Sequence, residues 1–158
     1  MSDITDELRG FLEGIDTAYL ATADSTGQPY VQHRGGPKGF IRALDDHTLA
    51  FVDFNGNRQY ISTGNLAEND KVCLFLIDYA RRQRIKVWGT ARMVPPAPEL
   101  LAQLPPLPPK TRAERVLLLT VTRWDVNCPK HIPMKVNAAD VAATIERLQA
   151  RIAELEKR

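Results

Sequence analysis

The sequence has few cysteines, little net charge and no long apolar run, and each of these shortages excludes a class of protein. The two cysteines, Cys73 and Cys128, make neither a disulfide framework nor a zinc cluster, which favours a reducing compartment. The formal net charge of +2 is too small to indicate a nucleic-acid surface by itself. No stretch approaches the roughly 18–20 apolar residues of a membrane helix, and the N-terminus lacks a signal-peptide pattern. We therefore expect a cytoplasmic protein with no metal site and no nucleic-acid or membrane partner.

What the chain does have is enough apolar sequence for one core. Of its 158 residues, 44% are hydrophobic and 25% are charged, a composition typical of a globular protein. This length suits one domain and is short for two. We expect residues 1–136 to form that domain and residues 137–158 to form a C-terminal helix.

The local patterns predict a mainly β protein with helices at its ends. Apolar spacing predicts a helix over 3–14 with Asp3 as its candidate cap, and another over 58–67 with Asn57 as its cap. A proline-rich stretch after residue 94 leaves room for one short helix. Alternation and turn residues predict strands at 18–24, 29–36, two within 40–54, 72–79, 84–94 and 115–126. About six antiparallel strands joined by tight turns favour a small barrel, because closure removes exposed edges.

The C-terminal helix carries an apolar stripe, and Asn137 resembles its N-cap. The stripe, spaced alternately four and three residues apart as in a short coiled coil, consists of Val141, Ile145, Leu148, Ile152 and Leu155. It can pack on the protein's own barrel or on a second subunit, and the sequence does not choose between the two.

The stretch NGNRQYISTGNL, residues 55–66, follows the apolar run LAFVDF and carries several groups that bind anions. A helix that starts here offers unpaired N–H groups and the positive end of its dipole. Arg58 supplies a planar cationic fork, and Ser62 and Thr63 add hydroxyl donors. An ordinary corner between a strand and a helix has the same pattern, so phosphate binding is one of two interpretations here.

Two further segments carry cations on predicted strands. In PYVQHRGGPKGF, alternation places Gln32 and Arg34 on one face and His33 on the other. Gly35 and Gly36 then either let a flat ligand approach the backbone or form a bulge at a barrel corner.

In RRQRIKVWG, alternation places Arg82, Arg84 and Lys86 on one face. Such a run is commonly a solvated face. Three cationic segments in one small barrel can nevertheless converge on one polyanion.

The stretch RWDVNCPKHIP places Trp124 at a strand end, ahead of Cys128 and His131 in a proline turn. Together these side chains can wall an aromatic ligand. Nucleophilic catalysis by a Cys–His pair is unconvincing because no orienting carboxylate is evident, which leaves only proton transfer by His131 or Cys128.

These segments, in this order, resemble the pyridoxamine 5′-phosphate oxidase-like family of FMN-binding split barrels over roughly residues 12–132. The best-matching stretch is TLAFVDFNGNRQYISTGNLAENDKVCLFLIDYARRQRIKVWGTARMV. It follows the family's order of strand, Ser-Arg-Lys-like corner, helix, L-x-E-N, apolar strand and R-Q-x-R-I-x-G-like strand. The resemblance implies a six-stranded antiparallel split barrel that forms a homodimer, with FMN bound at the subunit interface.

The resemblance also implies which residues contact the cofactor. The family's phosphate-binding Arg-Lys pair falls on Arg58 and Gln59, so the arginine is kept and the lysine is lost. The other implied contacts are Gln32, His33, Arg34, Gly35, Gly36, Lys38, Val52, Asp53, Asn57, Ser62, Thr63, Arg84, Lys86, Trp124, Cys128 and His131.

Two departures from the family concern the substrate. The segment PPAPELLAQLPPLPPKTRAER lacks the tyrosine–arginine–serine set that holds the substrate phosphate in true pyridoxamine phosphate oxidases. The chain also ends in a helix, whereas those oxidases have an R-L-x-P-like C-terminus. We therefore expect an FMN-binding oxidoreductase that transfers hydride or electrons to or from another small substrate. The alternatives are a deazaflavin-dependent reductase, a non-catalytic flavin- or haem-binding module and a plain dimeric scaffold.

Overall fold

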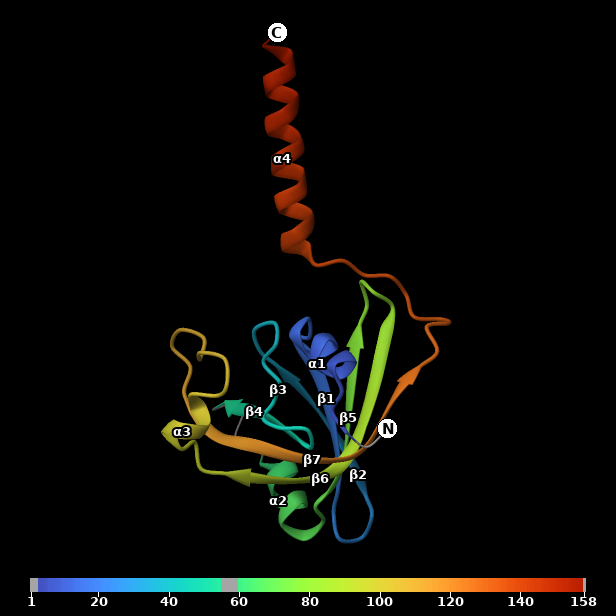
Figure 1. Cartoon of the computed structure of the whole chain (residues 1–158), viewed down its shortest axis with the longest axis vertical. Helices are drawn as coiled ribbons and strands as arrows, with labels where there is room; N and C mark the ends of the chain where they lie inside the picture. Colours follow the sequence, from blue (N-terminus) through green and yellow to red (C-terminus); the bar gives the residue numbers. More distant parts are fainter. Residues whose placement is uncertain (1–2, 55–59, 158) are drawn as a thin grey trace.

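The computed structural model describes residues 3–54 and 60–157, and its body is one antiparallel sheet of seven strands (Figure 1). The strands are β1 (Thr17–Ala23), β2 (Pro29–Gly35), β3 (Arg42–Ala43), β4 (Thr48–Phe54), β5 (Lys71–Asp78), β6 (Gln83–Val94) and β7 (Ala113–Asn127). The helices are α1 (Asp6–Glu13), α2 (Ile61–Glu68), α3 (Pro98–Leu101) and α4 (Ala138–Glu156). The predicted mainly β split barrel with flanking helices is confirmed. The two strands predicted within 40–54 are the two-residue β3 and β4, and they bring the sheet to seven strands where the resemblance implied six.

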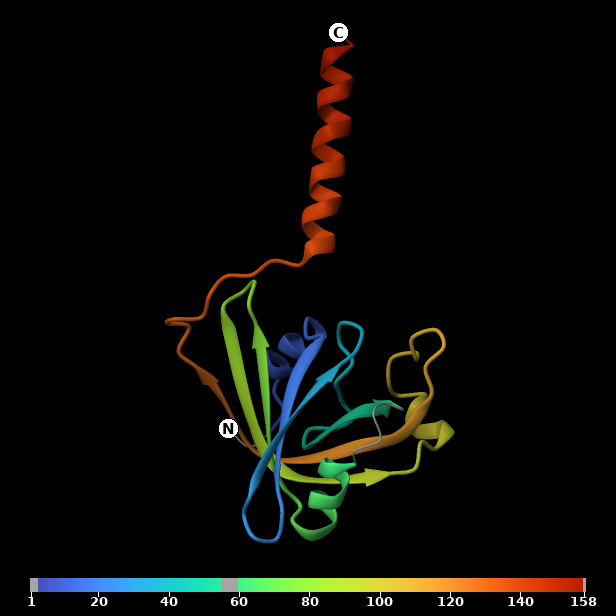
Figure 2. The ribbon, with the colours of Figure 1, turned by 180° about the vertical axis from the view of Figure 1, so that it is seen from behind.

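The strand order β2-β1-β5-β6-β7-β4-β3 leaves β2 at one end of the sheet and β4 beside the other end. The long strands β6 and β7 pair from Arg84 opposite Asn127 to Val94 opposite Val116 and curve through the body, as both ribbon views show (Figures 1 and 2). Their register shifts between Trp88 and Gly89, and a bulge of this kind bends a sheet. This curvature brings side chains of β2 and β4 into contact across the split.

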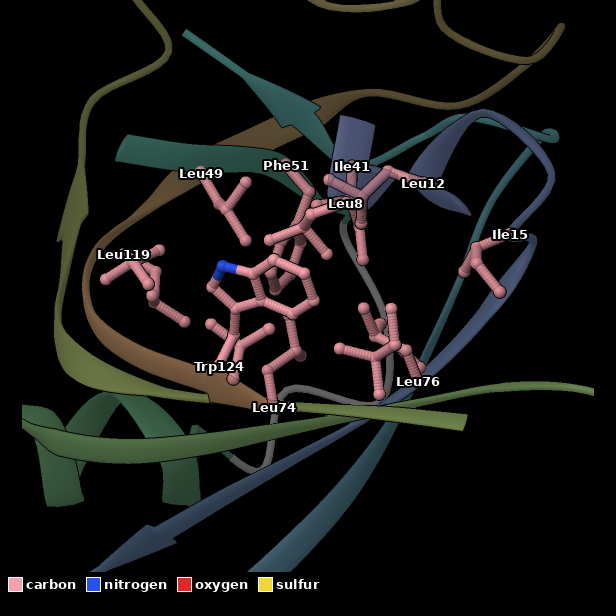
Figure 3. Packing of buried hydrophobic residues seen from close by; sticks show 14 of the residues in the cluster. Leu8, Leu12, Ile15, Ile41, Leu49, Phe51, Leu74, Leu76, Leu119 and Trp124 are labelled. Atoms are coloured by element: carbon pink, nitrogen blue, oxygen red, sulfur yellow. The ribbon is translucent and has the colours of Figure 1, made fainter. Parts of the chain in front are cut away.

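The main core fills the inside of the curved sheet. In β5 and β6 every second side chain is buried, including Leu74, Leu76, Ile85 and Val87, which is the period of a strand with one covered face. Leu8 and Leu12 of α1 close one side of this core, and Figure 3 shows them beside Trp124 and the leucines of the sheet. The burial of these side chains is the main source of stability for the body.

A second, smaller apolar cluster lies on the other face of β4 and β7. Ala50 and Val52 of β4 and Val116 of β7 pack there against Leu104, which follows α3. The leucines of the proline-rich segment therefore have a structural role, because they cover the outer face of these two strands.

Two predicted caps are wrong. Helix α1 has Thr5 at its N-cap, with no side-chain cap bond, and Asp3 lies further out, where its carbonyl accepts a hydrogen bond from Trp124. Helix α2 begins only at Ile61 and has Tyr60 at its N-cap, in the left-handed conformation at φ 53°, so the predicted Asn57 is not the N-cap. Asn57 itself lies outside the described residues.

The C-terminal helix α4 extends away from the body (Figures 1 and 2). Every described residue of α4 is exposed, so the interpretation in which its apolar stripe packs on its own barrel is wrong. The predicted cap is confirmed, since the Asn137 side chain accepts a hydrogen bond from the Ala139 N–H at 2.8 Å. No described helix is both long enough and apolar enough to span a membrane.

Candidate functional site

The start of α2 lies against strands β2 and β7 and presents its hydroxyl groups to them. Ser62 is almost fully buried, and its Oγ donates to Gln32 Oε1 at 2.8 Å. Thr63 Oγ1 accepts from Arg115 Nη1 of β7 at 2.8 Å. The helix therefore has a polar, partly cationic environment at its N-terminal turn.

An ion pair between Arg34 and Asp53 crosses the split of the barrel. Arg34 lies on β2, Asp53 lies on β4, and the two strands stand on opposite sides of the sheet order. Their side chains are only 14% and 11% exposed. The Nε of Arg34 is buried, and within residues 3–54 and 60–157 it has no hydrogen-bond partner, so one donor of this guanidinium is unsatisfied there.

Arg115 is a member of this group that the sequence interpretation missed. Its backbone lies opposite Asp53 in the pairing of β4 and β7, and its guanidinium lies 5.0 Å from the centre of the Tyr60 ring. The sequence pattern that could have revealed it is the alternation of β7. Arg115 lies in phase with Leu117 and Leu119 and therefore points to the interior face.

We call these residues the split cluster: Gln32, Arg34, Asp53, Ser62, Thr63 and Arg115. Two guanidinium groups, two hydroxyls and the start of a helix can together hold an anionic group such as a phosphate. Two carboxylates balance part of this charge: Asp53 pairs with Arg34, and Glu114 Oε1 lies 4.0 Å from Arg115 Nη2. Five of the six residues were predicted as cofactor contacts from the sequence, and the structure brings those five together.

The basic segments do not converge within one protomer. Arg84 and Lys86 lie on the outer face of β6, whereas the buried Ile85 and Val87 lie on the inner face that the split cluster shares. Arg82 is not in the strand at all. It lies in the turn at φ 54°, and its Nε donates to the carbonyl of Ile132 at 3.0 Å.

The outer face of the sheet has its own polar and aromatic groups. Arg84 lies opposite Asn127 of β7, and the buried Arg84 Nε and Asn127 Oδ1 both lack a hydrogen-bond partner in the part of the chain that the structure describes. Lys86 lies near Cys73, whose pKa is raised above its ordinary value by burial, although Lys86 and Arg123 act in the opposite direction. This thiol is therefore a poor nucleophile at neutral pH.

The remaining residues of the β2 segment have other surroundings. His33 is exposed and lies edge-on to Tyr19, with ring centres 5.7 Å apart. A Cβ on Gly36 would lie 2.6 Å from Phe40, so this glycine makes room for the core and not for a flat ligand. A Cβ on Gly35 would come within 3.1 Å of the His33 ring. Lys38 is exposed and lines a separate surface hollow beside Asp78 and Lys135.

Two more predicted contacts serve the packing of the body. Val52 points into the second apolar cluster, away from Asp53. Trp124 is only 1% exposed, lies in the main core and donates its indole N–H to the Asp3 carbonyl at 2.7 Å. The prediction that its ring walls a ligand is wrong in this protomer, because the core surrounds the ring.

The turn after β7 presents its two candidate catalytic residues to solvent. Cys128 and His131 are both exposed, and His131 has a φ of 64°. Between them and the body, Ile132 is buried and anchors the turn. Among the described residues, no group of three or more His, Cys, Asp or Glu side chains could hold a metal ion. The predicted contacts Asn57, Arg58 and Gln59 lie outside the residues that the structure describes.

The fold and this cluster together define an antiparallel split barrel with a cationic, hydroxyl-bearing group at its split. The family model described as pyridoxamine 5′-phosphate oxidase matches residues 4–128. The chain therefore belongs to the pyridoxamine 5′-phosphate oxidase family. A comparison with curated proteins found no match.

Solved structures share this fold at low sequence identity. HupZ from Group A Streptococcus is 19% identical, with a TM-score of 0.58, over 85% of this chain and 99% of that chain. A putative pyridoxamine 5′-phosphate oxidase from Lactobacillus delbrueckii is 21% identical, with a TM-score of 0.58, over 79% of this chain and 95% of that chain. The FAD binding protein from Mycobacterium smegmatis is 15% identical, with a TM-score of 0.51, over 80% of this chain and 97% of that chain.

Proposed function

We propose that the protein is an FMN-binding oxidoreductase whose split cluster holds the phosphate of the cofactor. The observation that carries this proposal is the largely buried Arg34 guanidinium, whose Nε has no partner among the described residues and which lies in one cluster with the hydroxyls at the start of α2. The family supports a flavin, and a protein of the same fold is described as an FAD binding protein. The proposed substrate is a small molecule other than pyridoxamine phosphate, because the segment 95–115 lacks a matching phosphate-binding set.

The residues of the chain would bind and orient the cofactor. Arg115 would turn one of its N–H groups from Thr63 to the phosphate, and the Thr63 hydroxyl would become a second donor. Asp53 would keep the Arg34 guanidinium in place. A bound flavin would supply the hydride or electron transfer itself.

We also propose that the protein acts as a homodimer with the cofactor at the interface. The split cluster lies on the inner face of the sheet, and the basic residues Arg84 and Lys86 lie on the outer face. One ligand that contacts both groups must therefore lie between two protomers. This placement explains how cationic segments that point apart in one chain can act on the same anion.

The test compares FMN with riboflavin, which lacks the phosphate. The protein is first freed of bound cofactor, and both ligands are titrated by the quenching of flavin fluorescence. Arg115→Gln removes a charged donor, so FMN affinity should fall roughly 10–100-fold. Riboflavin affinity should stay within about twofold, and Arg112→Gln, at an exposed arginine nearby, should leave both affinities unchanged.

Three results would contradict the proposal. Equal loss of FMN and riboflavin binding in Arg115→Gln would show that the arginine acts on the fold and not on the phosphate. A protein that is purified colourless and ignores added FMN would not be a flavoprotein, and titration with a deazaflavin would then be the next measurement. An absorption spectrum of haem in the purified protein would indicate a haem-binding module.

A further inference from the structure

Helix α4 exposes a continuous apolar stripe that no described residue outside the helix covers. The exposed fractions of its members are 41% for Val141, 48% for Ile145, 55% for Leu148, 54% for Ile152 and 50% for Leu155. The helix is 19 residues long and extends from the body (Figure 1). Five large apolar side chains on one face of a solvent-exposed helix indicate a surface that a partner covers.

The residue types along the stripe indicate a second helix of the same kind. In heptad notation Ile145 and Ile152 occupy a positions, and Val141, Leu148 and Leu155 occupy d positions, of which the last two are leucine. Isoleucine at a with leucine at d favours a parallel coiled coil of two helices, because each residue shape fits the packing geometry of its own layer in such a dimer. Other a/d combinations favour trimers or tetramers.

The charges beside the stripe select the same arrangement. Arg151 occupies a g position, and Glu156 occupies the e position five residues later. In a parallel dimer, the g position of one helix faces this e position of the other. Arg151 of each copy therefore faces Glu156 of the other copy, and the two-fold symmetry gives two such pairs. In a fully overlapped antiparallel dimer, Arg151 faces the uncharged Thr144, and no such pair forms.

We propose that α4 pairs with α4 of a second copy of this chain as a parallel two-stranded coiled coil. The two bodies then lie at the same end of the coil and are related by a two-fold axis along it. Arg151 also bonds Glu154 of its own helix at 2.5 Å, so it reaches the second copy by sharing or exchanging this contact. The inference does not depend on a flavin.

The length of the coil determines how it must be tested. An isolated helix of roughly 12–15 residues is marginal in water, and α4 is only slightly longer. The test therefore uses the full chain. Since all of α4 is exposed, substitutions in it leave the packing of the body intact, and unchanged thermal unfolding of the body shows this for each variant.

The first measurement is the dimer dissociation constant by sedimentation. Leu148→Glu, at a d position, should weaken the dimer at least tenfold, whereas Ala150→Glu, at the outer f position, should not change it. Arg151→Glu and Glu156→Arg should each weaken the dimer, and the double variant should restore it. Loss in both single variants without restoration in the double variant overturns the proposal, as does a wild-type chain that stays monomeric.

The second measurement determines whether the two α4 helices run parallel or antiparallel. In a chain with Cys73→Ser and Cys128→Ser, Leu155→Cys should form an intermolecular disulfide on mild oxidation, because a parallel coil places this position opposite itself. Ala150→Cys, on the outer face, is the matched control and should not cross-link. Absence of the Leu155→Cys cross-link in a chain that still dimerises shows an antiparallel or different contact and overturns the proposal.

Discussion

The ion pair between Arg34 and Asp53 offers the sharpest test of how the barrel closes. The pair joins β2 to β4, which stand far apart in the order of the sheet, so it acts as a clasp across the split. Asp53→Asn removes the carboxylate and leaves the Arg34 guanidinium in a position where its side chain is only 14% exposed. We expect this variant to lose stability through the uncompensated charge.

The size of the loss follows from the burial of the pair. Removing one partner of a fully buried ion pair costs about 3–5 kcal/mol. Because both side chains keep some exposure, we expect about 3 kcal/mol for Asp53→Asn and a similar loss for Arg34→Gln. The double variant places two neutral amides side by side, so its loss should fall about 2 kcal/mol or more short of the sum of the two single losses.

The assay is equilibrium unfolding in urea, followed by tryptophan fluorescence, to which Trp88 and the buried Trp124 both contribute. The pair of Arg9 and Asp46 is the matched control: their side chains are 33% and 77% exposed, and their coupling should be about 0–1 kcal/mol. A coupling between Arg34 and Asp53 below about 0.5 kcal/mol would refute the clasp, because independent sites add within that limit.

Three further predictions concern packing and reactivity. Gly89→Ala should destabilise the protein by about 2–4 kcal/mol in the same assay, because a Cβ there would overlap the carbonyl oxygen of Thr120; a loss below about 1 kcal/mol would contradict this close approach. Trp124→Phe should cost about 2–3 kcal/mol by thermal or urea unfolding, since it leaves a cavity and an unpaired carbonyl, and an unchanged midpoint would contradict its role in the core. Because burial raises the pKa of Cys73 above its ordinary value, its alkylation at pH 8 should be slower than that of the exposed Cys128, and its rate should rise with pH. Equal rates for the two thiols by mass spectrometry would refute this.

Much of the fold could be predicted because the signals are local. Alternation of buried and exposed side chains marks β5 and β6, where apolar residues recur at every second position. The helix α4 was predictable from its spacing and from Asn137, whose capping bond is present. The start of α2 was not, because a residue in the left-handed conformation at Tyr60 begins it without a side-chain cap, and nothing in the sequence marks such a start.

The candidate site could be predicted in its residue types and only partly in its arrangement. Alternation along β2 placed Gln32 and Arg34 together, and the structure joins them to Ser62 and Asp53 respectively. Trp124 was misplaced because a tryptophan near a strand end has the same sequence pattern whether it faces a ligand or the core. Arg115 was not predicted as a site residue because it stands at the start of the predicted strand, directly after the proline-rich segment, although its phase with Leu117 and Leu119 places it on the inner face.

The sequence by itself determined the strands, the apolar core and the apolar stripe of α4, because each depends on the spacing of residues that are close along the chain. Only the tertiary structure decided which basic residues meet. The curvature of the sheet brings Arg34 to Asp53 across the split, while the pleat sends Lys86 to the outer face. It also decided that α4 stands away from the body with its stripe exposed. Contacts between residues far apart in sequence depend on how the strands curve and pair, and no local pattern encodes that.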